Sequence, residues 1–292
     1  MKAYVIGNAA LDETLAIDRF VQPDASVFGR PLSRDLGGKG TNQAIALART
    51  GLPCQLFAAV GQDARGQEIA TRLQAEPVMA ELITQDGVST DASTILMAAT
   101  GENAIITTRD AAEAFTPDQA RAALADAQAG DLLVMQGNLS GQTTLAALQE
   151  AKARGLTTAF NPSPLQDYFA QLWPHVDIAY VNEGEAEALG GVAALQAQGV
   201  AQVVLTLGGA GARLITARQD LHVPASPCTV VDTTGAGDCF MAVSLGSAAL
   251  RGTDLDARAL AHGAAAAAHT VARAGTVSAF PSMAEMRALL AS

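Results

Sequence analysis

The chain has 292 residues, of which 49% are hydrophobic and only 16% are charged, so it is a folded protein and not a disordered one. Its 18 basic and 29 acidic residues give a net charge of −11, which argues against general binding to nucleic acid or to an anionic membrane surface. The sequence has neither a signal-peptide core nor an apolar run long enough to span a bilayer. We therefore expect a cytoplasmic protein without a membrane partner.

Short apolar runs alternate with helical segments along most of the chain, a pattern typical of βαβ units. Several of these runs are continuously apolar, as expected for parallel strands that are covered on both faces. The sequence therefore predicts a single α/β domain over residues 1–292, built on a doubly wound, mostly parallel sheet. The expected strands are residues 3–7, 56–61, 78–84, 131–137, 157–161, 178–182 and 203–207.

Two segments interrupt this alternation. Residues 11–18 and 27–36 are predicted to be extended pieces on either side of a turn, and residues 93–98 and 103–108 to be a hairpin turning at 100–102. We expect these segments, about 11–36 and 92–108, to form a small separate sheet. Its position in the chain favours a lid over a site at the carboxyl ends of the strands.

Helix boundaries are indicated by capping residues. Thr116 is predicted to cap a helix that ends near Gly130, and a second helix is expected between Ser140 and Gly155. Near the end of the chain, the spacing from Ser282 to Glu285 predicts a capping box that opens a last helix.

The cysteines and histidines carry no recognisable metal or catalytic-triad spacing. Cys54, Cys228 and Cys239 are expected to be buried free thiols. The four histidines are interpreted as structural or surface residues; they are His175, His222, His262 and His269.

The first glycine cluster, GGKGTNQA at residues 37–44, opens a helix. Its glycines allow close backbone approach and the helix start supplies free N–H groups, so a polar ligand can lie against the turn. Lys39 is one of only three lysines in the chain, but Gly40 stands where a P-loop needs Ser or Thr. A purely structural tight turn remains an equal alternative.

The second cluster, DTTGAGD at residues 232–238, runs into an apolar helix. Three small residues before a helix expose successive N–H groups, which can hold the charge that develops on a transferring phosphoryl group. Asp238 lies in the first helical turn. It is either an acid that stabilises the helix dipole or the acceptor of a proton from a substrate hydroxyl.

Two further motifs follow predicted strands. Asn182 and Glu185 open a helix at a strand end, where acids either stabilise the helix dipole or contact a solvated magnesium ion or phosphate. The segment TLGGAG at residues 206–211 is a glycine-rich strand end, and a plain turn is an equal interpretation of it.

These four motifs, in this order, resemble those of the ribokinase-like carbohydrate kinases of the pfkB family. The resemblance covers essentially the whole chain and includes GQD at residues 61–63, NPSP at 161–164 and RAG at 273–275. It implies ATP-dependent phosphorylation of a sugar hydroxymethyl group. It also implies a small β-sheet lid that often joins two subunits, and hence a homodimer formed through the lid.

The resemblance also implies roles for individual residues. Asp238 would be the general base, and the anion hole would be formed by Gly235, Ala236 and Gly237. The sugar would be held by Asp12, Gly38, Lys39, Gly40, Thr41, Asn42, Asn138 and Asp238. ATP would be bound by Asn182, Thr206, Leu207, Gly208, Gly209, Ala210, Gly211 and Gly237. Glu185 would act on hydrated Mg²⁺, and an activating K⁺ would be bound, mainly through carbonyl oxygens, by Asp232, Thr234, Thr270, Arg273, Gly275 and Ala279.

Two positions depart from the pattern of ribokinase-like sugar kinases, and both bear on the sugar. Asn138 stands where a glutamate is typical, and Ala10 where asparagine is common. D-ribose, phosphorylated on its O5 hydroxyl, is the first expectation, and another pentose, a ketohexose or a nucleoside is the alternative. A phosphorylated sugar also stays open, because basic residues are available near the lid at Arg30, Arg34 and Arg109.

Two rivals come from other classes of protein. The first is a non-catalytic sugar-binding regulator, which would not need a base such as Asp238. The second is a dinucleotide-binding oxidoreductase, which is disfavoured because the first strand runs into GNAALD at residues 7–12 and not into a GxGxxG motif.

Overall fold

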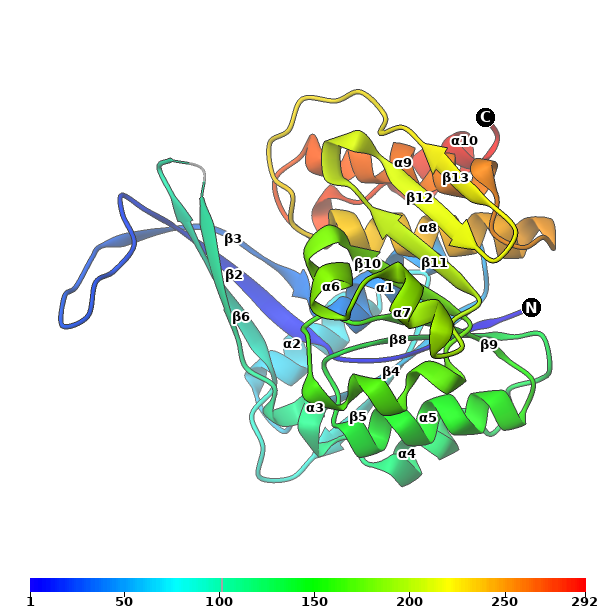
Figure 1. Ribbon diagram of the computed structural model, residues 1–292. Coiled ribbons are helices and arrows are strands. Elements are labelled where there is room, and N and C mark those ends of the chain that lie inside the picture. Colours follow the sequence, from blue (N-terminus) through cyan, green and yellow to red (C-terminus); the bar gives the residue numbers. More distant parts are fainter. Residues whose placement is uncertain (101) are drawn as a thin grey trace.

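A computed structural model describes residues 1–100 and 102–292. The described chain forms a nine-stranded sheet with helices on both faces and a four-stranded sheet that projects from one side (Figure 1). Gly101, which belongs to the predicted hairpin turn at 100–102, lies outside the described residues.

The large sheet has the order β13-β12-β11-β10-β9-β8-β1-β4-β5. All neighbours from β11 to β5 are parallel, whereas β12 and β13 add an antiparallel edge. From β1 the chain first builds outward through β4 and β5, then returns to build through β8 on the other side, so the strand order reverses beside β1. In such sheets ligands bind at the carboxyl ends of the strands next to this reversal. The strands are β1 (Ala3–Ile6), β4 (Cys54–Gly61), β5 (Met79–Gln85), β8 (Leu132–Gln136), β9 (Thr157–Asn161), β10 (Ile178–Asn182), β11 (Gln202–Thr206), β12 (Ala212–Thr216) and β13 (Asp220–Val223).

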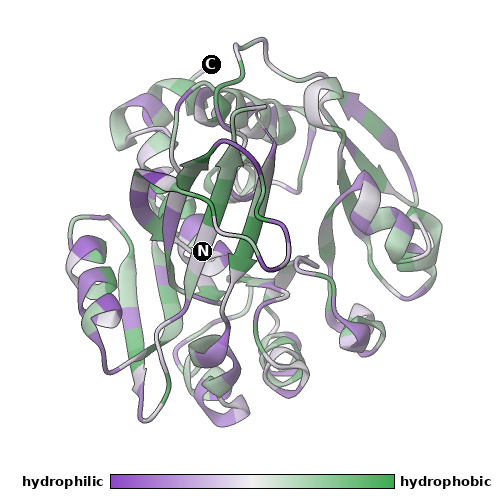
Figure 2. Cartoon of the chain, turned by 90° about the vertical axis from the view of Figure 1, so that its left-hand side faces the viewer, coloured by the Kyte–Doolittle hydropathy of each residue, from purple (hydrophilic) through white to green (hydrophobic). Residues whose placement is uncertain are grey.

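Helices cover both faces of this sheet, which confirms the doubly wound architecture. Along β1, Ala3 and Val5 enter one hydrophobic core while Tyr4 and Ile6 enter the other, because successive side chains of a strand point to opposite faces. Figure 2 shows the central strands as mostly hydrophobic. The first core is covered by α1 (Lys39–Arg49), α2 (Ala64–Leu73), α8 (Ala236–Arg251), α9 (Ala257–Val271) and α10 (Met283–Leu290). The second is covered by α3 (Asp110–Ala114), α4 (Pro117–Ala122), α5 (Gly141–Ala153), α6 (Glu183–Ala188) and α7 (Val192–Ala197), with the 3₁₀ turns η1 (Asp167–Gln171) and η2 (Trp173–His175).

The seven predicted strands are confirmed, with ends that shift by no more than two residues. The helices capped by Ser140 and Ser282 are also confirmed, the latter with the predicted capping box. The prediction that the helix capped by Thr116 reaches Gly130 is wrong. It ends at Ala122 because from Leu124 onward the N–H groups bond only three residues back and the chain turns. The antiparallel edge hairpin of β12 and β13 was not predicted.

The small sheet has the order β3-β2-β6-β7 and consists of the two predicted insertions. Its strands are β2 (Ala10–Ile17), β3 (Gly29–Gly37), β6 (Ala92–Ala98) and β7 (Asn103–Thr107). β2 starts shortly after β1 and β3 ends directly before α1, so this sheet is attached at the carboxyl end of β1. The insertion therefore lies beside the reversal point of the large sheet.

The three cysteines are free, as predicted. Cys54 and Cys239 are buried, but the prediction of burial is wrong for Cys228, which is exposed because it lies in the irregular segment between β13 and α8. Among the residues that the structure describes, no helix has the length and apolar character needed to cross a membrane.

Candidate active site

The GGKG turn is fixed to the end of β1 by Asn8. The Asn8 side-chain oxygen accepts the Gly40 N–H at 3.3 Å, and its carbonyl accepts the Thr41 N–H at 3.1 Å and the Thr41 hydroxyl at 3.4 Å. A Cβ on Gly40 would lie 2.7 Å from the Asn8 nitrogen, and Gly38 has a positive φ of 85°. Gly40 and Thr41 are thus packed into the protein, where they shape the turn that starts α1.

The second glycine cluster starts α8. Gly235 is the N-cap in a left-handed conformation and provides no capping side chain, so the N–H groups of the first turn are left to a ligand. The Ala236 N–H is an exception, because it bonds to the Thr233 carbonyl at 3.3 Å. A Cβ on Gly237 would meet no atom within 4 Å. The helix start is therefore open on the side of Gly237 and suited to an anion.

The two glycine clusters contact each other through Asp238, although they are almost 200 residues apart in the sequence. Its carboxylate is 5% exposed and is held by two neighbouring amides of α1. Asn42 Nδ2 donates to Oδ2 at 3.0 Å and Gln43 Nε2 donates to Oδ1 at 2.8 Å. Lys39 Nζ lies 3.8 Å from Oδ1, beyond hydrogen-bond distance. The first helical turns of α1 and α8 are thereby joined through one buried acid.

A pocket of about 100 Å³ lies between these two helices and the ends of the central strands. Six of the predicted site residues line it, drawn from all four motifs, and they share it with residues of β9, β10 and α8. The predicted residues in the lining are Lys39, Asn182, Glu185, Thr206, Gly237 and Asp238. The others are Asn161, Tyr180, Val181 and Met241.

Asn182 and Glu185 have a structural role as well as a place at this pocket. They form a capping box at the start of α6, in which Asn182 Oδ1 accepts the Glu185 N–H at 2.8 Å and Glu185 Oε2 accepts the Asn182 N–H at 3.0 Å. The glycine-rich segment after Thr206 continues from the pocket as the short turn η3 (Gly208–Ala210). Gly208 and Gly209 have open space where a side chain would stand.

Asp12 on β2 is 7% exposed, and only one of its two carboxylate oxygens has a hydrogen-bond partner. Thr276 Oγ1 donates to its Oδ2 at 3.2 Å, whereas Oδ1 has no partner. Burial raises the pKa of this carboxyl from 3.8 to about 6, and the charges of Asp35 and Asp238 act in the same direction. A Cβ on Gly37 would lie only 2.0 Å from Asp12 Oδ1, so the glycine makes room for the acid.

Unpartnered polar atoms are concentrated in this region. Within residues 1–100 and 102–292, the buried side-chain atoms without a hydrogen bond are four oxygens, on Asp12, Asn42, Gln136 and Asn138. Each is an acceptor, and burial without a partner costs about 1–3 kcal/mol per group. A ligand with several hydroxyl groups would supply the missing donors.

Three residues of the predicted cation site lie together. Asp232 Oδ1 accepts the Thr234 N–H at 2.9 Å and its hydroxyl at 2.7 Å, and Asp232 Oδ2 accepts the Gly275 N–H at 3.1 Å. Thr270 and Arg273 lie at and just beyond the end of α9, and the Arg273 guanidinium bonds Glu285 at 3.0 Å. Ala279 follows in η4 (Val277–Ala279).

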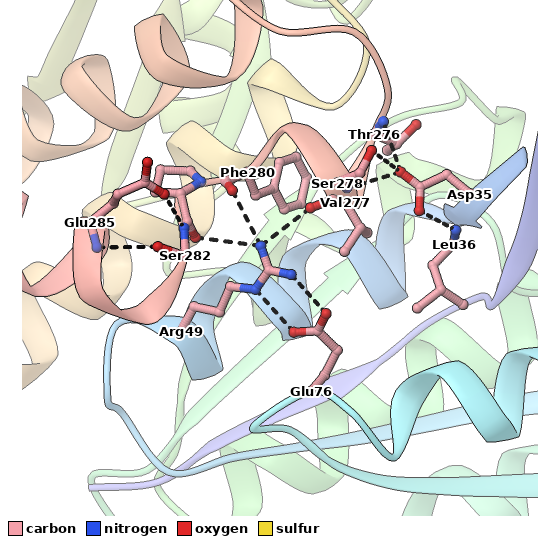
Figure 3. A network of polar contacts seen from close by, with 11 residues as sticks. Asp35, Leu36, Arg49, Glu76, Thr276, Val277, Ser278, Phe280, Ser282 and Glu285 are labelled. Carbon is pink, nitrogen blue, oxygen red and sulfur yellow. Dashed lines mark hydrogen bonds and ion pairs between the residues drawn. The ribbon is translucent and has the colours of Figure 1, made fainter. Parts of the chain in front are cut away.

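Asp35, at the end of β3, was not predicted as a site residue. Its Oδ2 accepts the N–H groups of Thr276 and Ser278 at 3.2 and 2.9 Å and the Ser278 hydroxyl at 2.6 Å (Figure 3). Since Thr276 also donates to Asp12, the segment that contains η4 is tied both to the small sheet and to the predicted sugar anchor.

Arg49 holds the same segment from the end of α1 (Figure 3). It makes two bonds to Glu76, at 3.0 and 2.7 Å, and both side chains are largely buried. One of its nitrogens also lies 3.2 to 3.4 Å from three carbonyl oxygens, those of Val277, Phe280 and Pro281. The Phe280 ring in turn lies 2.9 Å from where a Cβ on Gly235 would be, so this segment supports the turn before α8.

Comparison with known proteins agrees with this geometry. Residues 2–283 match the model of the pfkB family of carbohydrate kinases. The chain belongs to this family. It is 28% identical over 302 residues to a ribokinase of Staphylococcus aureus strain COL, covering 98% of both chains, and 26% identical to a deoxyribokinase of Salmonella typhi, covering 97% of this chain and 96% of that one. The crystal structure of a ribokinase from Thermotoga maritima superposes with a TM-score of 0.89 at 26% identity, over the full length of both chains.

The raised pKa of Asp12 predicts that Asp12→Asn stabilises the unliganded protein at neutral pH. Because the folded state binds this proton more tightly than the unfolded state, ionisation of Asp12 costs stability above pH 6, and the cost disappears as the pH falls through 6 towards 4. A shift of two units corresponds to at most about 3 kcal/mol, or a rise in Tm of several degrees. Thermal melts at about pH 7.5 and pH 4 measure it.

Asp18→Asn, at an exposed position just after the same strand, is the matched control and should leave Tm unchanged at both pH values. If Asp12→Asn were equally or less stable than the parent protein near neutral pH, the burial penalty assigned to Asp12 would be wrong.

Proposed function

We propose that this carbohydrate kinase transfers the γ-phosphoryl group of ATP to the O5 hydroxyl of D-ribose. The observation that carries the proposal is the pocket that brings Asp238, Lys39 and Gly237 together with residues of the two strand-end motifs. Such an arrangement places an acid, a cation and an open helix N-terminus around one small volume. These are the groups that phosphoryl transfer to a hydroxyl requires.

In this proposal Asp238 Oδ2 or Oδ1 accepts the proton of the attacking hydroxyl while its carboxylate stays anchored on α1. The open N–H groups at the start of α8, those of Gly237 and Asp238, stabilise the charge on the phosphoryl oxygens, and Lys39 adds a positive charge beside them.

ATP would lie along the strand ends at Asn182 and Thr206 and over the open glycines Gly208 and Gly209, where nothing occupies the space. Among the residues described, no three His, Cys, Asp or Glu side chains cluster as a protein-only metal site. A single carboxylate, Glu185, at the pocket fits Mg²⁺, which keeps several waters and is bound largely by substrate phosphates. When bound, Mg²⁺ would neutralise phosphate charge.

The sugar would be held by the unpartnered acceptors of Asp12, Asn42 and Asn138, since hydroxyl groups donate to all three. This set suits a polyol but does not distinguish ribose from deoxyribose, another pentose, a ketohexose or a nucleoside. A phosphorylated sugar has less support, because two of the three basic residues near the lid already pair with acids: Arg34 lies 2.7 Å from Glu68 and Arg109 lies 3.1 Å from Glu113. A non-catalytic regulator is disfavoured by the intact arrangement around Asp238.

We further propose that the small sheet closes over the sugar and joins two copies of the chain. Three of its large apolar side chains and that of Phe28, just before β3, are exposed, which is unfavourable for an isolated surface; the three are Leu32, Ile105 and Ile106. Light scattering after size exclusion should give the mass of a dimer, and substitution of Ile105 and Ile106 by serine should give a monomer. A monomeric parent protein at micromolar concentration would contradict this proposal.

Asp238→Asn should keep the fold and sugar binding but lower kcat by about a hundredfold to ten-thousandfold, because only the proton acceptor is lost while the helix N-terminus stays in place. Coupled ADP release gives kcat, and calorimetric titration gives sugar affinity. Asp118→Asn, the same change at an exposed position on α4, is the control. If Asp238→Asn kept more than about a tenth of the parent kcat, Asp238 would not be the base.

Asp12→Ala should lower kcat/KM for the best sugar at least about tenfold, because a hydrogen bond to a charged group is worth roughly 1.5–3 kcal/mol. Asn138→Ala should cost less, since its amide forms an uncharged bond. Both variants are assayed on ribose, deoxyribose, fructose, tagatose and nucleosides. A larger loss at Asn138 than at Asp12 would make the amide the main selector and overturn the proposed seat of the sugar.

K⁺ should activate the enzyme more than Na⁺ at constant ionic strength. The reason is that Asp232 and Thr234 directly precede the α8 turn and Asp232 also bonds Gly275, so a cation bound there would order the anion site. Initial rates are measured across a titration of each salt. Equal rates in both salts would remove the proposed cation site.

A further inference from the structure

Two buried glutamines continue the hydrogen-bonding chain beyond Asp238. Gln43 on α1 is fully buried and Gln136 at the end of β8 is 1% exposed. Gln136 Nε2 donates to Gln43 Oε1 at 2.7 Å, and Gln43 Nε2 donates to Asp238 Oδ1 at 2.8 Å. Neither glutamine lines the pocket that contains Asp238.

The direction of this chain is fixed by chemistry. An amide has a donor end and an acceptor end of nearly the same shape, and a carboxylate only accepts. If the Gln43 amide were reversed, its oxygen would face the Asp238 carboxylate. The donor from Gln136 prevents this reversal, because it can bond only to the Gln43 oxygen.

The Gln136 amide fits only because Gly7, which has no side chain, leaves room for it. A Cβ on Gly7 would lie 2.1 Å from Gln136 Oε1, so the amide occupies the volume that any other residue at position 7 would fill. Gln136 Oε1 has no hydrogen-bond partner of its own. The protein therefore keeps a polar side chain here at a cost in stability, although an apolar side chain would fill the same site.

We propose that Gln43 and Gln136 are positioning residues for Asp238: together they hold Oδ1 so that the carboxylate stays ionised and oriented towards the attacking hydroxyl. This inference rests on the proposed role of Asp238 as the base. The other ionisable side chains near this carboxylate are Lys39 on α1, Asp12 on β2 and the buried Cys239 on α8 itself. Glu185 on α6 and Tyr180 on β10 line the same pocket. With sugar saturating, Asp12 is engaged by the ligand in the parent protein and in every variant.

The test is the pH dependence of kcat at saturating sugar and ATP for Gln43→Met, a change that keeps the length of the side chain and removes its amide. Loss of a donor to an ionised group should lower kcat about tenfold to a hundredfold near neutral pH. It should also move the acid limb of the profile to higher pH, since the carboxylate is then protonated more easily. Sugar KM should change little.

Gln136→Met should act in the same direction but more weakly, because it removes only the group that orients Gln43. In the double variant the second change should add nothing, since both act through one contact. Gln55→Met is the matched control. Gln55 accepts a 2.6 Å bond from Lys2 near the opposite, amino-terminal end of β4, so its loss should leave kcat and the profile unchanged.

Each outcome of these measurements either supports or overturns the positioning role of the two glutamines. If Gln43→Met folds, by its thermal melt, and its acid limb overlays that of the parent protein, the positioning role is overturned, even if its Tm is lower. If Gln43→Met does not fold, Gln136→Met decides by the same criterion. An active Asp238→Asn enzyme would remove the proposed base itself, whereas an inactive one beside an unshifted Gln43→Met profile would remove only the inference about the glutamines.

Discussion

A single buried carboxylate, that of Asp238, organises the site, and it is stabilised without a close ion pair. Lys39 is 3.8 Å away, so most of the stabilisation comes from the amides of Asn42 and Gln43. A buried charge is costly unless it is hydrogen bonded, which makes the contact between α8 and α1 a condition for folding in this arrangement. The same contact keeps the acid at the mouth of a helix N-terminus, where a second anion can approach.

The fold explains why the N-termini of α1 and α8 lie together at the carboxyl edge of the large sheet. α1 follows β1 after the insertion of β2 and β3, and the reversal of strand order beside β1 leaves a crevice at the carboxyl edge of the sheet. α8 reaches this edge from the far end of the chain. Its turn is supported from behind by the segment around η4, which Asp35 and Arg49 hold by hydrogen bonds. The small sheet and the anion turn are therefore joined through a few residues after α9.

Sequence patterns predicted the features that depend on local chemistry. Strand periodicity, capping residues and the two glycine turns arise from the chemistry of a few neighbouring residues. The seven parallel strands and the four-stranded insertion were therefore predictable, and the order of the motifs indicated the family. The end of the helix after Thr116 was not, because alanine-rich residues 122–125 fit a helix equally well and the turn there is made by bonds three residues back. Gln43, Gln136 and Asp35 were also missed, since their partners are far away in the chain. A polar residue at a fully buried helix position, such as Gln43, is the one signal that could have pointed to them.

The unpartnered acceptor oxygens lower the stability of the free protein and are available to bind a ligand. Asp12, Asn42 and Asn138 each keep a buried oxygen without a donor, and Asp12 is held ionised at neutral pH in a place that favours its neutral form. These costs fall on the free protein, and a ligand that donates hydrogen bonds would relieve them. Because the three side chains come from β2, α1 and the loop after β8, a ligand must bridge separate elements to satisfy them together. In the proposed sugar site, selectivity would depend on how many hydroxyl groups reach these oxygens at once, so an analogue that lacks one hydroxyl would leave a buried acceptor unpaired and lose more than the bond itself.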